Sequence, residues 1–219
     1  MSPLQQELNQ FMAGVSTQVP AEILMAVGQA YAELASSGRF NGALKVGERA
    51  PEFTLPNMRG ELVTLSTLLQ EGSVVLSFYR GAWCPFCNIE LRALQKALPE
   101  LRAKGATVVA VSPEQPDYSM PLAKREAIQF EVLSDHANAL ARQFGIVFPL
   151  QGELLRISRD VFGVDLPKFN GDESWELPIP ATYLIDREGV IRLAFVDPEF
   201  RNRLDPAMIL DALDSLGQA

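Results

Sequence analysis

The chain has 219 residues, of which 47% are hydrophobic and 21% are charged, and its formal net charge is −8 at pH 7. This composition is typical of a globular protein and excludes a disordered or fibrous chain. The acidic balance argues against nucleic acid as a partner, because phosphate binding needs clustered Lys and Arg. The length allows one sizeable core, so we expect one domain with additions.

No stretch of the sequence approaches the roughly 18 uninterrupted apolar residues that a membrane span needs. The opening residues Met1-Ser-Pro-Leu-Gln-Gln-Glu lack the basic and apolar regions of a secretory signal. We therefore expect no membrane association and a cytoplasmic location. In that reducing compartment, two cysteines are expected to be catalytic or metal-binding rather than a structural disulfide.

Two amphipathic helices are predicted within the first 38 residues. Ser2 can cap the first helix, with Pro3 at its opening position and Gln5 completing a capping-box pattern. We expect residues 1–40 to form a helical extension that packs on the rest of the chain or makes a homodimer contact. A lid over a functional site is the alternative interpretation. The apolar stripes are Leu4, Leu8, Phe11, Met12 and Val15, then Ile23, Leu24, Val27, Tyr31 and Leu34.

Strands and helices alternate from residue 44 onward, so residues 41–219 are predicted to form one α/β domain. Residues 74–79 are a nearly continuous apolar run, which is typical of a strand buried on both faces. Residues 85–103 carry a helical apolar stripe, and residues 107–111 read as the next strand. A strand, a helix and a strand within about 40 residues predict a parallel βαβ unit.

The remainder of the chain continues this alternation around one irregular segment. Residues 146–178 are rich in proline and aromatic residues and predict an ordered insertion with one short helix near 153–162. Residues 181–185 and 190–196 flank Asp186-Arg-Glu-Gly189, which is a hairpin signature. The other predicted elements are a helix over 117–128, a strand over 130–133, a helix over 137–144 and a last helix opened by Asp205-Pro206.

The dithiol Cys84-Pro85-Phe86-Cys87 lies between the first buried strand and its helix. A zinc site needs four ligands, and besides the cysteines the chain offers the single His136, so we expect neither metal nor cofactor. Two buried cysteines acting as small hydrophobes are the alternative. At a helix N-terminus, however, free backbone N–H groups and the helix dipole favour a thiolate.

The two sulfurs are predicted to differ in their surroundings. Pro85 at the first helical position fixes the local φ and has no N–H group to leave unpaired. Cys87 begins the apolar stripe and is expected to be the more buried sulfur, with Cys84 the more exposed one. One helical turn brings the two sulfurs close enough to form a disulfide with modest adjustment.

Gly81-Ala-Trp83-Cys84-Pro-Phe-Cys87 after a buried strand resembles the active site of thioredoxins and glutaredoxins. Three further segments, in order, resemble the alkyl hydroperoxide reductase/thiol-specific antioxidant (AhpC/TSA) family, the peroxiredoxins. The resemblance covers residues 44–196 apart from the insertion, and it implies a thioredoxin fold, a central mixed β-sheet flanked by helices. The segments are Val46-Gly-Glu-Arg-Ala-Pro-Glu-Phe-Thr-Leu55, Leu133-Ser-Asp135 with Ala139-Leu-Ala141 and Phe144-Gly145, and Thr182-Tyr-Leu-Ile-Asp-Arg-Glu-Gly189.

Peroxiredoxins place their peroxide-attacking cysteine in the pattern Pro-x-x-x-Thr-x-x-Cys. The resemblance therefore puts Cys87 in the attacking position, Cys84 in place of the Thr and Arg80 in place of the Pro. In the family, that Thr and a distant Arg hold the peroxide oxygens. The place of the distant Arg is occupied by Pro180, which leaves Arg80 or Arg192 as candidate substitutes.

The segment Ile179-Pro180-Ala-Thr resembles the cis-proline segment that thioredoxins set against their dithiol. We therefore expect a cis bond before Pro180, and a trans proline at a strand edge is the alternative. Thioredoxins also keep a buried acid under the site, but the matching strand has Ser77, so proton handling is left unassigned. His136 is expected to be a capping or surface residue.

These features predict a thiol-based oxidoreductase. In the first hypothesis, an antioxidant thiol peroxidase, the Cys87 thiolate reduces a hydroperoxide, Cys84 condenses with the sulfenic acid, and thioredoxin or glutathione resets the disulfide. In the second, Cys84 attacks a protein or low-molecular-weight disulfide and Cys87 resolves it. Trp83, Pro85 and Pro180 favour the second, whereas the segment-wide resemblance favours the first. A redox-sensing scaffold that oligomerises on oxidation is the third.

Overall fold

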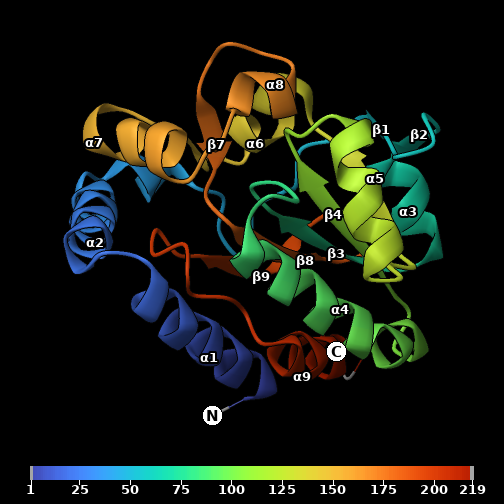
Figure 1. Ribbon diagram of the computed structural model, residues 1–219. Coiled ribbons are helices and arrows are strands. Elements are labelled where there is room, and N and C mark those ends of the chain that lie inside the picture. The colour runs from blue at the N-terminus through green and yellow to red at the C-terminus, as the bar shows by residue number, and fades with distance from the viewer. Residues whose placement is uncertain (1, 218–219) are drawn as a thin grey trace.

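The computed structural model describes residues 2–217 and is built around a central sheet (Figure 1). In pairing order the strands are β5 (Glu131–Ser134), β4 (Ala106–Ser112), β3 (Ser73–Phe78), β8 (Ala181–Ile185) and β9 (Ile191–Val196). β3, β4 and β5 are parallel, whereas β8 and β9 pair antiparallel with their neighbours. This mixed sheet confirms the predicted α/β architecture of a thioredoxin fold.

The predicted βαβ unit is formed by β3, α4 (Pro85–Ala103) and β4, and α4 has the predicted bounds. β3 pairs with β4 from Ser73 opposite Ala106 to Phe78 opposite Val111. β3 has a strand on each side and helices on both faces of the sheet, so its side chains beyond Ser73 are buried. This position explains why residues 74–79 are almost all apolar.

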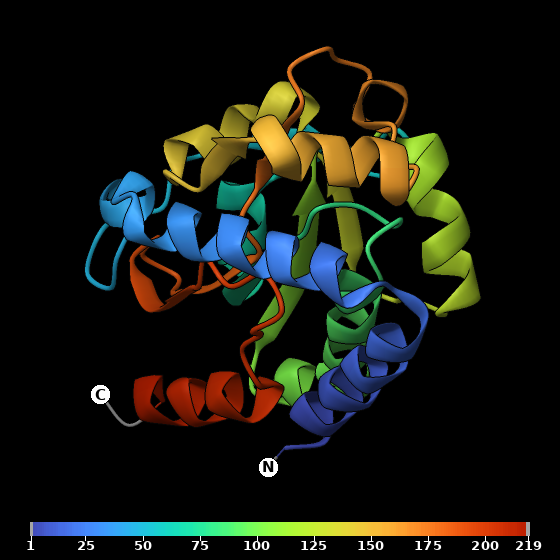
Figure 2. The ribbon, with the colours of Figure 1, turned by 60° about the vertical axis from the view of Figure 1, so that its left-hand side comes forward.

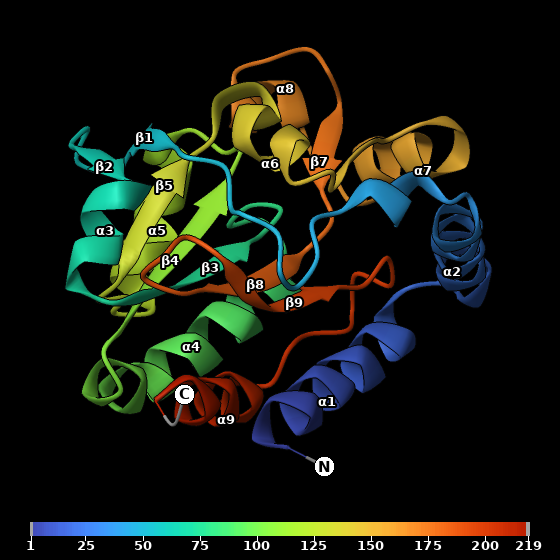
Figure 3. The same cartoon turned by 180° about the vertical axis from the view of Figure 1, so that it is seen from behind.

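Helices cover both faces of the sheet. α4 and α9 (Pro206–Leu216) lie side by side against one face (Figures 1 and 3). On the other face Phe144, directly after α6 (Ala139–Gln143), packs against Phe78 and Tyr183. Because successive strand residues point to opposite faces, Thr182 faces α4, where its hydroxyl donates a hydrogen bond to Glu90.

The two predicted N-terminal helices are present as α1 (Pro3–Gln18) and α2 (Ala21–Ser36). The Ser2 Oγ accepts a hydrogen bond from the backbone N–H of Gln5 at 3.2 Å. The Gln5 side chain turns to Asn9 instead of closing the capping box. α1 lies along α4, and α2 lies against α7 (Gly152–Arg156), as Figure 2 shows. Between residues 2 and 217 no helix combines the length and the apolar character needed to cross a membrane.

Residues 146–178, the segment predicted to be an insertion, hold more than the one short helix expected near 153–162. α7 continues into a π-helical turn, and the two short strands pair antiparallel. Strands of three residues are too short to give a periodic pattern, which is why the sequence predicts only the helix. The elements beyond α7 are η3 (Ile157–Val161), α8 (Leu166–Asn170), β6 (Val147–Pro149) and β7 (Glu176–Pro178).

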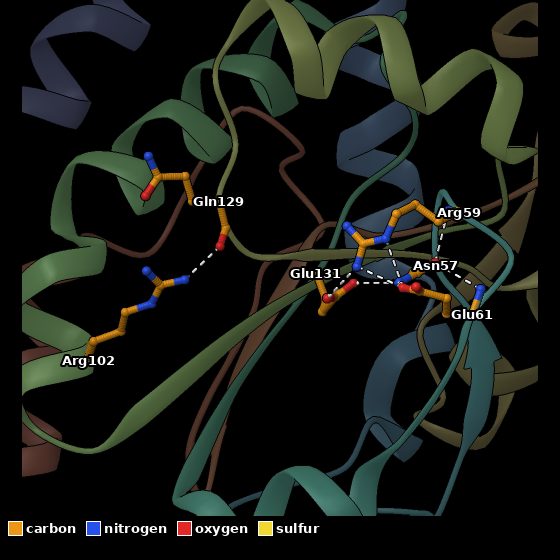
Figure 4. Close-up of polar contacts among 6 residues, drawn as sticks. All are labelled: Asn57, Arg59, Glu61, Arg102, Gln129 and Glu131. Atoms are coloured by element: carbon orange, nitrogen blue, oxygen red, sulfur yellow. Dashed lines mark hydrogen bonds and ion pairs between the residues drawn. The ribbon is translucent and has the colours of Figure 1, made fainter.

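A hairpin of β1 (Thr54–Pro56) and β2 (Leu62–Thr64) is fastened to the edge of the sheet (Figure 4). The side-chain amide of Asn57 donates to Glu131 on β5 at 3.0 Å, and Arg59 pairs with Glu61 and Glu131. Arg59 is largely exposed, so this ion pairing orients the hairpin more than it stabilises it. The remaining described elements are α3 (Leu65–Glu71), α5 (Pro116–Arg125), η1 (Arg39–Gly42) and η2 (His136–Asn138).

The core under the N-terminal helices is continuous with the core of the sheet, since Leu4, Leu8 and Tyr31 belong to the same buried cluster as β3 and α4. We expect Leu8→Ala to lower the free energy of unfolding by about 2–5 kcal/mol, because it leaves a cavity between α1 and the sheet domain. The change should appear as a shift of one cooperative transition in chemical denaturation.

Met25→Ala is the matched control, because Met25 lies on α2 with 67% of its surface exposed. Its effect should stay within about 0.5 kcal/mol. A separate early transition for the helices in Leu8→Ala, with the main transition unchanged, would contradict a shared core.

Candidate active site

The candidate site begins where β3 ends and the chain turns into α4. Gly81 has φ +148°, and a Cβ there would lie 2.3 Å from the Trp83 indole nitrogen, so only glycine fits. Cys84 is the N-cap residue of α4 with an extended backbone, and Pro85 opens the helix as predicted. The loop thus delivers the Cys84 side chain to the positive end of the helix.

Both cysteines are reduced and neither has any exposed surface. The predicted difference in exposure is therefore wrong, because the N-terminal helices and the segment after β9 cover the end of α4. The two sulfurs still differ in what lies beside them. Cys84 lines a cavity, whereas Cys87, one turn further along α4, is not among the residues that line it.

The Cys84 sulfur is held by Arg80, whose side chain is also buried. The Arg80 Nη2 donates a hydrogen bond to the Cys84 Sγ at 3.0 Å, and its Nη1 donates to the Tyr31 hydroxyl at 2.9 Å. The guanidinium also lies 4.3 Å from the centre of the Phe200 ring. Arg80, proposed from the sequence as a supporting residue, is thus in contact with the dithiol.

The Cys87 sulfur faces a different arginine, Arg203, from the segment between β9 and α9. The Arg203 Nη2 lies 3.6 Å from the Cys87 Sγ, and its Nε forms an ion pair of 2.6 Å with Glu90. Glu90 also accepts a hydrogen bond from Thr182 at 3.4 Å. Burial, opposed by the Arg203 charge, raises the pKa of Glu90 to about 7. A buried acid therefore does lie beside the dithiol, on the helix and not on the strand.

Sequence reasoning missed both members of this pair. Glu90 occurs three residues after Cys87 within the apolar stripe of α4, and a carboxylate at such a position indicates a buried role. Arg203 has no comparable local signal, because its position depends on how the chain returns across the sheet after β9.

The two thiols have opposite ionisation tendencies. Burial alone would raise the pKa of Cys84, but the hydrogen bond with Cys87 and the charges of the two arginines lower it well below its ordinary value. Burial raises the pKa of Cys87, and the hydrogen bond and negative charge of Cys84 raise it further. These directions favour Cys84 over Cys87 as the thiolate of the pair.

A second buried carboxylate, Glu114, holds the loop in front of the dithiol. It accepts hydrogen bonds from the backbone N–H of Ala82 at 2.9 Å and from the Ser119 hydroxyl at 2.8 Å. Burial raises its pKa above the ordinary value. Glu114 fixes the backbone between β3 and α4 and was not anticipated from the sequence.

Pro180, Arg192 and His136 were also weighed as site residues from the sequence, and none of them contacts the sulfurs through a hydrogen bond or ion pair. No peptide bond between residues 2 and 217 is cis, so the predicted cis bond before Pro180 is wrong; Pro180 follows β7 as the chain passes to β8. Arg192 pairs with Asp186. His136 is exposed. Within the same residues no group of three or more His, Cys, Asp or Glu side chains is placed to hold a metal.

A cavity of about 350 Å³ leads to Cys84 and Arg80. Its walls are mostly apolar and come from the N-terminal helices, residues 150–177, the loop between β3 and α4, the start of α4 and the segment after β9. Phe11 of α1, Val27 of α2 and Leu154 of α7 are among them. The N-terminal helices therefore form part of the wall between the dithiol and the solvent.

A mixed sheet that presents a buried dithiol at a helix N-terminus, with an arginine in contact with each sulfur, is typical of a thiol-based redox protein. Residues 46–194 match the model of the AhpC/TSA family, and the chain belongs to this family. It is similar to Peroxiredoxin Bcp of Escherichia coli K12, with 30% identity over 162 residues that cover 74% of this chain and 92% of that protein.

Solved structures with the same fold include peroxidoxin BcpB from Mycobacterium tuberculosis, with a TM-score of 0.61, 22% identity and coverage of 79% of this chain and 98% of that one. Another is the Xanthomonas campestris bacterioferritin comigratory protein, studied for its alkyl peroxide reduction activity, with a TM-score of 0.57, 19% identity and coverage of 82% and 94%. The chain is accordingly a thiol peroxidase, an antioxidant oxidoreductase, and the dithiol–disulfide alternative is not favoured. Peroxiredoxins act on hydroperoxides and are reduced by thioredoxin-type partners.

Removing the Arg80 charge should raise the pKa of Cys84. We expect Arg80→Met to move the midpoint of thiolate formation upward by about one to three pH units, because an opposite charge in contact stabilises the ionised form by that amount. The pH dependence of alkylation at Cys84, located by peptide mass spectrometry, measures this midpoint. Arg192→Met, which breaks a pair away from the dithiol, should leave it unchanged.

Proposed function

We propose that the peroxidase uses Cys84 as the attacking thiolate and Cys87 as the resolving thiol. The observation that carries this proposal is the 3.0 Å contact of Arg80 with the Cys84 Sγ at the wall of the cavity. A peroxide entering the cavity meets Cys84 first, with a guanidinium beside it to stabilise negative charge. This order reverses the roles that the family pattern assigns, in which the cysteine at position 87 attacks.

The chemistry balances with one proton taken from the solvent. The Cys84 thiolate attacks one peroxide oxygen, the O–O bond breaks, and the leaving alkoxide takes up the solvent proton to become the alcohol. Cys84 is then a sulfenic acid. The Cys87 sulfur attacks the Cys84 sulfur, hydroxide leaves and takes up the Cys87 proton as water, and a Cys84–Cys87 disulfide results. The hydrogen bond between the two thiols supports this step, because it already joins the atoms that must bond.

The cavity supports an organic hydroperoxide as the preferred substrate. Its walls include Phe11, Val27 and Leu154, and burial of an alkyl chain against such side chains contributes about 25 cal/mol per Å² of apolar surface. Hydrogen peroxide gains nothing from these walls. The alkyl peroxide reduction activity of the X. campestris protein is consistent with this substrate class.

The remaining elements of the proposal concern partners. Thioredoxin or glutathione would reduce the Cys84–Cys87 disulfide in the cytoplasm, where these two reductants keep protein thiols reduced. A homodimer contact through the N-terminal helices stays a prediction. The supporting roles of Trp83 and Pro85 follow from their places beside Cys84, one closing the loop against Gly81 and the other opening α4.

Trapping of sulfenic acid after one equivalent of an organic hydroperoxide tests the order of the cysteines. Cys87→Ser should accumulate a stable sulfenic acid on Cys84 as fast as the wild type reacts, since the attacking thiolate is intact. Cys84→Ser should react slowly, because Cys87 does not line the cavity through which the peroxide enters. Rapid trapping at Cys87 in the Cys84→Ser protein would assign the attack to Cys87 and overturn the proposed order.

A larger side chain in the cavity should slow the reaction with organic hydroperoxides more than the reaction with hydrogen peroxide. We expect Val27→Trp to lower kcat/KM for a long-chain organic hydroperoxide by about tenfold or more, and to leave the value for hydrogen peroxide within about threefold. Met25→Trp, on the exposed side of the same helix, is the matched control. An equal loss for both peroxides in Val27→Trp would mean that the cavity does not select the alkyl group.

A further inference from the structure

The active site contains two buried arginines, and each is in contact with a different sulfur. Arg80 serves the thiolate of Cys84. The Arg203 side chain is only 1% exposed, and its Nη2 is 3.6 Å from the Cys87 Sγ. The ion pair with Glu90 uses the Arg203 Nε, whereas Nη2 points at the Cys87 sulfur, where a guanidinium stabilises a thiolate more than a neutral thiol.

Arg203 is fixed firmly in this position. Its Nε pairs with Glu90, and its Nη1 donates hydrogen bonds to the backbone carbonyls of Asn202 and Phe200. These contacts use the other nitrogens and leave Nη2 for the sulfur. Arg203 lies beyond residues 46–194, the part of the chain that matches the family, so the segment after β9 supplies this contact.

The charges around Cys87 change during the proposed cycle. In the reduced protein, burial, the hydrogen bond with Cys84 and the Cys84 negative charge all raise the pKa of Cys87, and Arg203 and Arg80 oppose them. Once Cys84 is a sulfenic acid, its negative charge is gone. Burial is then opposed by two guanidinium groups with no thiolate between them, so Cys87 becomes able to ionise when it must attack.

We infer that Arg203 is a catalytic residue of the resolving step: it stabilises the Cys87 thiolate that attacks the Cys84 sulfenic acid. The Cys87 electron pair forms the S–S bond, the S–O bond of the sulfenic acid breaks, and the hydroxyl leaves as water with the proton that Cys87 gives up. Glu90 is a positioning residue that holds Arg203. The inference rests on the proposed function, in which Cys84 is oxidised first.

The test separates the two chemical steps in Arg203→Met. A single turnover with an organic hydroperoxide is stopped at intervals, and Cys84 sulfenic acid and the Cys84–Cys87 disulfide are measured by trapping and mass spectrometry. Sulfenic acid formation should slow less than disulfide formation, because Arg80 still donates its hydrogen bond to Cys84, on which Arg203 acts only through its charge. Disulfide formation should slow by about tenfold or more, which corresponds to a rise of one unit or more in the pKa of Cys87.

The pH profile of disulfide formation provides a readout that a purely structural role would not move. The rate should rise with pH as Cys87 ionises, and Arg203→Met should shift this rise to higher pH. Arg203→Lys, which keeps the positive charge, should restore part of the rate. Besides Arg203, the titratable groups that interact electrostatically with Cys87 are Cys84, Arg80, Tyr31, Tyr79, Glu90 and Glu114.

Two further variants make the outcome decisive. Arg203→Met leaves Glu90 buried without its partner, so the double variant Arg203→Met/Glu90→Gln provides a neutral site if the single variant fails to fold, and it should show the same slow disulfide formation. Arg192→Met should behave as the wild type in both steps. Unchanged disulfide formation in the folded Arg203 variants, or equal slowing of both steps, would overturn the inference. Absence of sulfenic acid at Cys84 in the wild type would instead refute the proposed function.

Discussion

The ionic hydrogen bond between Arg80 and the Cys84 thiolate is the interaction on which the rest of the site depends. A charged sulfur with no exposed surface is costly unless a buried opposite charge and hydrogen bonds compensate it. The N-terminus of α4, the Cys87 thiol and the guanidinium together provide this compensation. The guanidinium in turn needs its own partners, and Tyr31 and Phe200 supply them from α2 and from the segment after β9. Two segments that are distant in sequence, α2 and the residues after β9, therefore both contact the loop between β3 and α4.

The elements that carried a strong periodic signal were predicted well from the sequence. The apolar run of β3 and the stripe of α4 are set by local chemistry, and the structure places them within a residue of the predicted bounds. The dithiol follows from the same source, because it lies at the junction of these two elements. The helical extension was also predicted, but its contribution to the cavity could not be, since an amphipathic face does not reveal which surface it covers.

The features that depend on distant parts of the chain were missed or wrong. Arg203 reaches Cys87 across 116 positions in sequence, and no pattern near residue 203 distinguishes it from an exposed arginine. The bond before Pro180 was inferred from a likeness to thioredoxins, and the trans form shows that this likeness does not extend to the chain geometry there. Equal burial of both sulfurs has a similar origin, because their cover comes from α1, α2 and Phe200 rather than from α4 itself.

The arginine contacts also affect the reduction potential of the Cys84–Cys87 disulfide. Every interaction that stabilises a thiolate stabilises the dithiol form relative to the disulfide, in which neither sulfur carries a charge. By thermodynamic linkage this preference raises the reduction potential of the pair, as in oxidoreductases whose reduced form is selectively stabilised. The disulfide formed at the end of a turnover is therefore a comparatively strong oxidant. The buried guanidinium that prepares Cys84 for the peroxide also makes the return to the dithiol thermodynamically favourable for an incoming electron donor.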